Sequence, residues 1–215
     1  MKKRVMIQMP VTAGIRSVFD GRDDIEYERF TELSEANILQ HIGNYDAVIL
    51  GVAPFTARII EKADRLKIAS RRGVGYDSVD VAALTRAGIP LTVVGTANSV
   101  TVAEHALFFM LALAKRARAY DREVRKGNWN IRFDLPAFDL AGRKLLILGF
   151  GRIGRRLVKR CVAMDMEVLV HDPYVIQDAI VTAGATPVPD WRAVLPEIDF
   201  LSVNCPKNAE TDGMV

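Results

Sequence analysis

The residues best suited to chemistry are the three glycines of the segment Gly149–Gly154, which follows the apolar run Leu145–Leu148 and precedes a helical pattern. Gly149 would allow a tight turn out of a strand. Gly151 would let the backbone approach a pyrophosphate, and Gly154 would let the helix pack closely on the strand. The N–H groups at the start of that helix favour phosphate. This strand–turn–helix context predicts a dinucleotide-binding turn.

An acidic residue supports that interpretation. Asp172 ends the next apolar run, Val168–Val170, and is followed by Pro173 and Tyr174 rather than by an arginine. A carboxylate there would accept hydrogen bonds from the adenosine ribose and would repel a 2′-phosphate, which favours NAD over NADP. The alternative is a glycine turn in an unrelated α/β unit, and the position of Asp172 argues against it.

Alternating strands and helices must position these residues. The first hundred residues predict an α/β unit with a mostly parallel sheet. Its expected strands are Val5–Met9, Ile25–Phe30, Ala47–Leu50, Lys67–Ser70 and Leu91–Val94, and its expected helices are Glu35–Ile42, Thr56–Ala63 and Val79–Ala87.

The longest predicted helix follows, from Val102 to Lys126. Thr101 and Glu104 have the spacing of a capping box at its start, and Gly127 would end it. The segment Asn128–Ala141 is expected to be irregular and to pack on a surface.

The elements after Asp172 continue the α/β pattern. We expect strands at Thr186–Val188 and Asp199–Asn204, and short helices at Gln177–Ala183 and Asp190–Leu195. With the two strands around the glycine turn, they predict a sheet in the order 3-2-1-4.

Composition excludes several classes of protein. The chain has 215 residues, a net charge of +3 and 50% hydrophobic residues, which argues against disorder. The densest basic cluster is expected to be a solvated helix face, and no nucleic-acid partner is predicted. That cluster is Arg152, Arg155, Arg156, Lys159 and Arg160.

The cysteines, histidines and apolar runs predict neither a disulfide framework, nor a metal site, nor a membrane span. Cys161 and Cys205 form no disulfide or metal pattern, which favours a reducing, cytoplasmic location. His41, His105 and His171 form no metal-ligand cluster. The longest apolar run, Ala106–Ala114, is too short to span a membrane.

Four blocks of sequence occur in an order and spacing that resemble the D-isomer-specific 2-hydroxyacid dehydrogenase family. Members of that family include D-3-phosphoglycerate dehydrogenases and glyoxylate/hydroxypyruvate reductases. The blocks are Arg71–Asp80, Thr96–His105, the glycine turn through Asp172-Pro173, and Asn204–Pro206 with Glu210-Thr211.

The resemblance implies a flavodoxin-like substrate-binding domain, residues 1–98, followed by a partial NAD-binding Rossmann domain, residues 99–215, both with parallel sheets. It implies NAD as cofactor and a small 2-hydroxy or 2-keto acid as substrate. The implied substrate-binding residues are Gly73, Val74, Gly75 and Asn98. The implied cofactor-binding residues are Gly149, Gly151, Arg152, Ile153, Gly154, Asp172, Cys205, Pro206 and Thr101.

Departures from the family pattern limit what is carried over. Leu50 stands where members acting on phosphoglycerate often have an arginine, which argues against a phosphorylated substrate, and Ser78 replaces an asparagine. The family's catalytic Arg, Glu and His are expected beyond Val215. No catalytic residue is therefore assigned, and the chain alone is expected to be inactive.

Two further expectations concern the oligomeric state and an alternative function. The resemblance implies a homodimer formed through the helix near Val102. The alternative function is a non-catalytic NAD-binding regulatory or interaction module of the same fold, because fold does not fix function.

Overall fold

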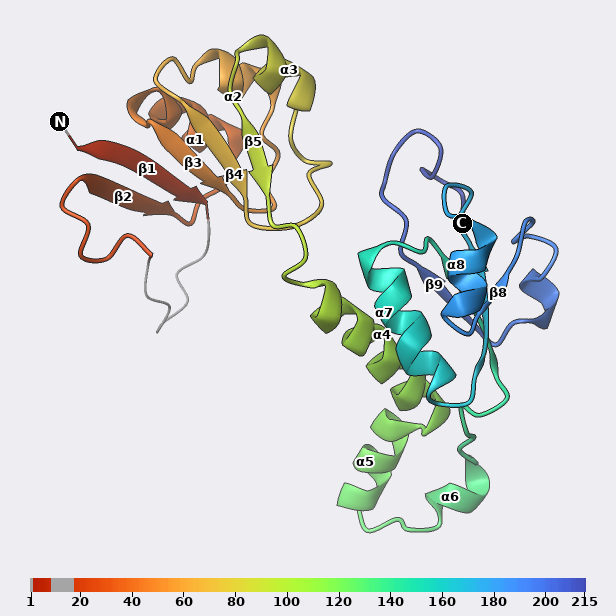
Figure 1. The fold of residues 1–215 in the computed structure, drawn as a ribbon. Coiled ribbons are helices and arrows are strands. Elements are labelled where there is room, and N and C mark those ends of the chain that lie inside the picture. The colour runs from red at the N-terminus through yellow and green to blue at the C-terminus, as the bar shows by residue number, and fades with distance from the viewer. Residues whose placement is uncertain (1, 9–17) are drawn as a thin grey trace. The chain divides into compact units, whose positions relative to one another are not determined.

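The computed structural model describes residues 2–8 and 18–215. The chain divides into two compact units, Met1–Thr96 and Ala97–Val215, each with its own sheet (Figure 1). Met9, the predicted end of the first strand, lies outside the described residues.

Unit 1 is built on a parallel sheet. Within the described residues it has five strands in the order β2-β1-β3-β4-β5, and neighbouring strands are parallel. The predicted strands of this unit are therefore confirmed, with small shifts at their ends. The strands are β1 (Lys3–Gln8), β2 (Ile25–Phe30), β3 (Ala47–Leu50), β4 (Ile68–Arg71) and β5 (Leu91–Val93).

Short helices cover this sheet and close one hydrophobic core. Ser34 and Asp80 cap two of them, because their side chains accept hydrogen bonds from the N–H groups of Asn37 and Ala83. The core includes Met6, Val48 and Leu50 from the sheet, packed against apolar residues of the helices. The helices are α1 (Glu35–His41), the 3₁₀ helix η1 (Ile42–Asn44), α2 (Ala57–Glu61) and α3 (Val81–Arg86).

Unit 2 has a parallel sheet in the order β8-β7-β6-β9, which confirms the predicted order 3-2-1-4. Residues Leu145–Leu148 of β6 are fully buried, as expected for a central strand covered on both faces. The strands are β6 (Lys144–Leu148), β7 (Glu167–His171), β8 (Thr186–Pro187) and β9 (Phe200–Val203).

Helix α7 (Arg152–Val162) follows β6, and α8 (Gln177–Thr182) follows β7. The predicted helix Asp190–Leu195 is wrong: turns occupy residues 191–194 and the 3₁₀ helix η2 (Leu195–Glu197) follows them. Asp190 does not cap a helix but accepts a hydrogen bond from the N–H of Arg192, at 3.0 Å, in a local turn.

The single long helix predicted for Val102–Lys126 is also wrong. The structure has α4 (Ser99–Ala114), α5 (Ala117–Arg125) and the short α6 (Ile131–Asp134), and the last two extend beyond the end of α4 (Figure 1). The break lies at Arg116, whose φ is +52°. The N–H of Phe138 donates to the carbonyl of Ala114, at 3.0 Å, and so takes an acceptor that a continuous helix would use.

The predicted capping box is also wrong, because the helix begins before Thr101 and Glu104 pairs with another helix. Helix α4 begins at Ser99 with Asn98 as its N-cap, so Thr101 lies within the first turn. Glu104 instead forms an ion pair of 2.9 Å with Arg160 of α7, and Ser99 accepts a hydrogen bond from Arg156, at 3.1 Å. Part of the basic cluster on α7 thus holds two helices together rather than forming a solvated face.

Each sheet begins with the same reciprocal pair of hydrogen bonds. The N–H of Arg4 donates to the Asp46 carboxylate at 2.9 Å, and the N–H of Asp46 donates back to the carbonyl of Arg4 at 2.8 Å. In unit 2 the N–H of Lys144 donates to the Asp199 carboxylate at 2.8 Å, and the N–H of Asp199 returns a bond of 2.9 Å to the carbonyl of Lys144. These pairs fix the amino ends of neighbouring strands.

We expect Asp46→Asn to destabilise unit 1 by about 1 kcal/mol near neutral pH, the difference between a charged and a neutral acceptor. The hydrogen bond from the N–H of Arg4 and the neighbouring Arg65 lower the pKa of Asp46. A lowered folded-state pKa stabilises the fold above the ordinary aspartate value of about 3.9, and this contribution disappears as pH falls through the folded-state pKa.

Urea unfolding of wild type and variant at a series of pH values checks this. The gap between the two curves should be largest near neutral pH and should close in acid. A gap that stays constant down to the acid end would contradict a role for the Asp46 charge.

No helix among the described residues is long and apolar enough to cross a membrane.

Candidate functional site

The turn between β6 and α7 comes so close to β9 that its first residue must be glycine. Gly149 has a φ of +100°, and a Cβ there would lie 2.8 Å from the backbone nitrogen of Cys205. Its N–H donates to the carbonyl of His171, at 2.8 Å. The turn is therefore fixed between the ends of β7 and β9.

The other two glycines of the motif differ in what surrounds them. A Cβ on Gly154, in the first turn of α7, would lie 2.1 Å from the carbonyl oxygen of Gly149, so the helix packs directly on the turn. A Cβ on Gly151 would meet nothing within 4 Å. The fold itself explains Gly149 and Gly154, whereas Gly151 leaves open space beside the backbone.

The N-terminus of α7 faces that space without a side-chain cap. Its N-cap is Gly151, no side chain caps it, and no acidic residue lies in the first turn. Arg152 and Ile153 are the first residues of the helix. Uncapped N–H groups and the helix dipole together favour an anion at this position.

The Asp172 carboxylate is held beside the turn by two backbone groups. One oxygen accepts from the N–H of Phe150, at 2.7 Å, and the other accepts from the N–H of Tyr174, at 2.9 Å. Each oxygen keeps a second lone pair for another donor. Asp172 therefore presents an oriented acceptor pair at the end of β7.

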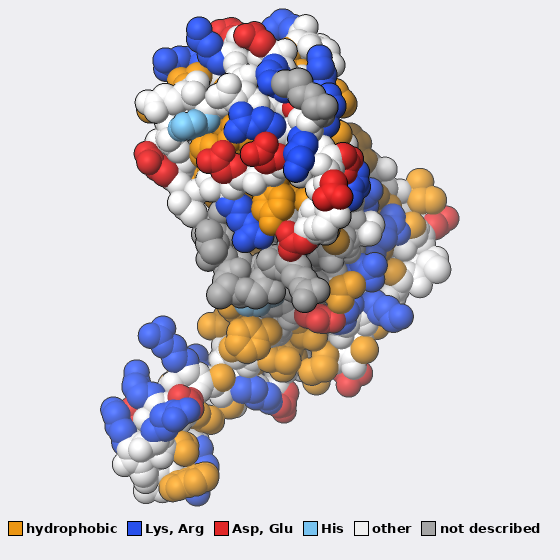
Figure 2. Space-filling view, turned by 90° about the vertical axis from the view of Figure 1, so that its left-hand side faces the viewer, with side chains coloured by type: hydrophobic (Ala, Val, Ile, Leu, Met, Phe, Trp, Pro, Cys, Tyr) orange, Lys and Arg blue, Asp and Glu red, His pale blue; other side chains and the backbone are white. Residues whose placement is uncertain are grey.

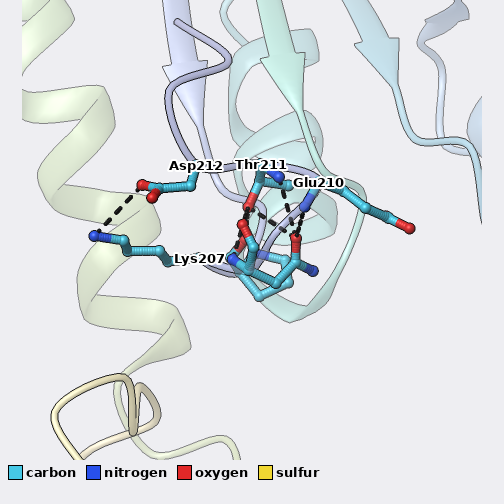
Figure 3. Close-up of polar contacts among 6 residues, drawn as sticks. Lys207, Glu210, Thr211 and Asp212 are labelled. Atoms are coloured by element: carbon cyan, nitrogen blue, oxygen red, sulfur yellow. Dashed lines mark hydrogen bonds and ion pairs between the residues drawn. The ribbon is translucent and has the colours of Figure 1, made fainter.

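The loop after β9 has a fixed shape (Figure 3). The side-chain oxygen of Asn208 accepts from the N–H groups of Glu210 and Thr211, at 2.9 and 3.1 Å, and the Thr211 hydroxyl donates to the carbonyl of Pro206, at 2.5 Å. Lys207 points toward Asp212, with 3.5 Å between the charged groups (Figure 3). The bond from Thr211 ties this loop to Pro206, and the preceding residue, Cys205, has its backbone nitrogen beside Gly149.

A contact between side chains joins the loops after β7 and β9. The Tyr174 hydroxyl donates to the Glu210 carboxylate, and this bond raises the pKa of the Tyr174 phenol. The sequence offered Tyr174 only as a residue after Asp172, and the partner lies 36 positions away in the chain. The two loops meet because β7 and β9 lie on either side of β6, so their carboxyl ends are close in space.

Four other residues singled out by the sequence pattern lie in structural surroundings. His171 lies with its Nδ1 2.9 Å from the carbonyl oxygen of Val188. Cys161 is in the core, and burial raises the pKa of its thiol to about 12. Asn98 and Thr101 both lie at the start of α4, the helix that contacts α7 through Ser99.

The predicted substrate loop is in unit 1, after β4. The carbonyl of Gly73 accepts from the N–H of Val94, at 3.1 Å. In the part of the chain that the structure describes, the N–H groups of Gly73, Val74 and Gly75 donate to no other group. Successive amide donors of this kind suit an anion.

The described residues, 2–8 and 18–215, contain no group of three or more His, Cys, Asp or Glu side chains that could hold a metal ion.

Together the sheet order, the glycine turn and the acidic residue after β7 define an α/β protein of the dinucleotide-binding class. Residues 107–215 match the model of the D-isomer specific 2-hydroxyacid dehydrogenase, NAD binding domain. The chain belongs to this family, and these residues are its NAD-binding domain.

The relatives in sequence and structure agree with this. The chain is 32% identical over 195 residues to a D-3-phosphoglycerate dehydrogenase of Archaeoglobus fulgidus, covering 90% of this chain and 37% of that protein. It is 32% identical to a glyoxylate reductase of Korarchaeum cryptofilum, covering 85% of this chain and 56% of that one. The chain thus spans between about a third and about half of these relatives' lengths.

Among solved structures, a Staphylococcus aureus NAD-dependent formate dehydrogenase in complex with NAD is similar, with a TM-score of 0.83 and 26% identity. The match covers 97% of this chain and 67% of that one.

Proposed function

We propose that this chain provides the substrate-binding and NAD-binding parts of an NAD-dependent oxidoreductase that transfers a hydride between NAD(H) and a small D-2-hydroxy acid or 2-keto acid. Unit 1 is the flavodoxin-like substrate domain, and unit 2 is the Rossmann domain. The observation that supports this most directly is the open space at Gly151 beside the oriented Asp172 carboxylate.

Each residue of the turn has a role in the proposal. The N–H groups at Arg152 and Ile153 bind the pyrophosphate, and Gly151 lets it approach the backbone. Asp172 accepts from the ribose hydroxyls of the adenosine. When bound, NAD supplies the hydride chemistry, and the protein supplies binding and orientation.

The remaining residues are assigned to the cofactor or to the substrate within their own units. Cys205 and Pro206 lie at the carboxyl end of β9, beside the turn, and are assigned to the nicotinamide side of the cofactor. Thr101 and Asn98, at the start of α4, are assigned to cofactor and substrate respectively. The N–H groups of Gly73, Val74 and Gly75 bind the substrate carboxylate.

Calorimetric titration with NAD and NADP tests the proposal. The chain is expected to bind NAD, and NADP at least about tenfold more weakly, because the 2′-phosphate meets the Asp172 carboxylate. Absence of any NAD binding to the folded chain would overturn the assignment of the turn.

We expect Asp172→Ala to weaken NAD binding by about tenfold or more, the value of a hydrogen bond to a charged group, and to bring the affinities for NAD and NADP together. Asp190→Ala is the matched control, since Asp190 also accepts a local backbone N–H but lies in the turn after β8. An equal loss in both variants would show a general effect on unit 2.

A second copy of the chain is the proposed partner of α4 and the arm formed by α5 and α6. Large apolar side chains on these helices are more than half exposed, including Phe108 at 57%, Phe109 at 54% and Phe133 at 71%. Figure 2 shows hydrophobic side chains gathered in the middle of the view, at the level of α4 in Figure 1. This surface suits a homodimer better than exposure to water.

A further inference from the structure

Gln8 ends β1 at the point where the strand order of unit 1 reverses. The sheet places β2 on one side of β1 and β3 on the other. Ile7 pairs with Ile49, so Gln8 lies level with Leu50 of β3. In open α/β sheets, ligands bind beyond the carboxyl ends of the strands at such a reversal.

The Gln8 side chain is fully buried but only half bonded. Its residue exposure is 0%, and its oxygen accepts a long hydrogen bond of 3.4 Å from the N–H of Gly51. Its Nε2 is buried and has no hydrogen-bond partner among the described residues. A buried donor without an acceptor is costly. The bond from Gly51 accounts for the amide oxygen, but no contact among the described residues accounts for the donor end of the amide.

The neighbouring polar groups at this edge are donors as well. Leu50 pairs with Arg71 of β4, and the alternation along the strands places Gln8, Leu50 and Arg71 on one face. The Nε of Arg71 is likewise buried and lacks a partner within the described residues. The loop Gly73–Gly75 adds its amides. Donors outnumber acceptors at this edge, where the nearest carboxylate oxygen is that of Asp77, 3.3 Å from the position of a Cβ on Gly75. Such an edge suits a ligand with several acceptor oxygens.

We propose that the Gln8 amide donates a hydrogen bond to an oxygen that the acid bears outside its carboxylate, either the 2-oxo oxygen or a 3-hydroxyl. This inference rests on the proposed function, in which the amides of Gly73–Gly75 bind the carboxylate. It makes Gln8 a residue that selects oxygenated short acids over plain carboxylic acids.

Three acids that differ by one oxygen at each step test this: propionate, pyruvate and hydroxypyruvate. Their dissociation constants are measured on the isotope-labelled chain from the chemical shifts of the Gly73 and Gly75 amides. If Gln8 binds the 2-oxo oxygen, we expect wild type to bind pyruvate more tightly than propionate. If Gln8 binds the 3-hydroxyl, we expect wild type to bind hydroxypyruvate more tightly than pyruvate. Gln8→Met should lower that preference about fivefold, the value of one hydrogen bond, and leave propionate binding unchanged.

Two further variants make the result decisive. Gln8→Glu keeps an acceptor for Gly51 and removes the N–H₂ donor, and its charge weakens all three acids alike. Its readout is therefore the ratio of their dissociation constants, which should lose the same preference, and this variant decides the outcome if Gln8→Met does not fold. Ile7→Met, on the opposite face of β1, should change nothing. The melting temperature of Gln8→Met should change little, because the substitution removes an unsatisfied donor and also removes the acceptor of the long bond from Gly51.

The outcomes separate the two proposals. If all three acids bind but the preference is the same in wild type and Gln8 variants, Gln8 has no selective role and the proposed function stands. If Gln8→Met weakens all three acids equally, Gln8 acts only on the fold. If no acid shifts the Gly73 and Gly75 amides, the substrate loop is misassigned and the inference falls with it.

Discussion

Gly151→Ala is expected to leave unit 2 folded while weakening NAD binding by at least about tenfold. A Cβ at this position meets no protein atom within 4 Å, so the substitution costs the fold only the difference between glycine and alanine at an N-cap, about 1 kcal/mol. The added methyl group fills the space that the pyrophosphate needs. Calorimetry with NAD, together with a thermal melt of the same variant, measures both quantities.

Gly154→Ala is the matched comparison and should behave in the opposite way. Its Cβ would lie 2.1 Å from the carbonyl oxygen of Gly149, so α7 must move away from the turn. Forcing an extra group into packed structure costs about 1–3 kcal/mol, and the clash with rigid backbone places this variant at the upper end. A Gly151→Ala variant that binds NAD as well as wild type would remove the main support for the cofactor assignment.

Phe109→Asp is expected to convert a dimer into a monomer. Phe109 is 54% exposed on α4, and its ring lies edge-on to the ring of His105, with 4.2 Å between centroids. A charge at the centre of an apolar interface is buried without a partner and costs several kcal/mol per subunit. Size-exclusion chromatography with light scattering over a range of concentrations gives the mass.

Val181→Asp is the control, because Val181 of α8 is 58% exposed and lies outside the proposed interface. It should leave the dimer intact. A wild-type chain that is monomeric at every concentration, or a Phe109→Asp variant that stays dimeric, would contradict the proposed partner.

Much of the architecture was predictable because it depends on local sequence. Apolar runs bounded by turn residues gave the strands, and the spacing of the glycines around Gly151 gave the turn between β6 and α7. The order of the second sheet followed from the class of unit that such a turn implies. In unit 1, the positions of strands and helices were predicted, with errors of a few residues at their ends.

The errors arise where a distant group decides local structure. Nothing between Lys115 and Ala117 breaks a helix by propensity, and the break follows from the bond between Phe138 and the carbonyl of Ala114. Glu104 has the spacing of a cap but is used by Arg160 on another helix. Unsatisfied groups such as Nε2 of Gln8 are invisible until all partners are placed.

The reciprocal pairs at Arg4–Asp46 and Lys144–Asp199 use polar groups of each unit for folding at one edge of its sheet. At the amino edge of both sheets, the backbone and carboxylate groups of these pairs satisfy one another. At the carboxyl edge, the amides of Gly73–Gly75 and the space at Gly151 are left open. In each unit, polar groups are therefore paired within the fold at the amino edge of the sheet and available to a ligand at the carboxyl edge. Substitutions at the amino edge should therefore change stability without changing ligand affinity, whereas Gly151→Ala at the carboxyl edge should chiefly change ligand affinity.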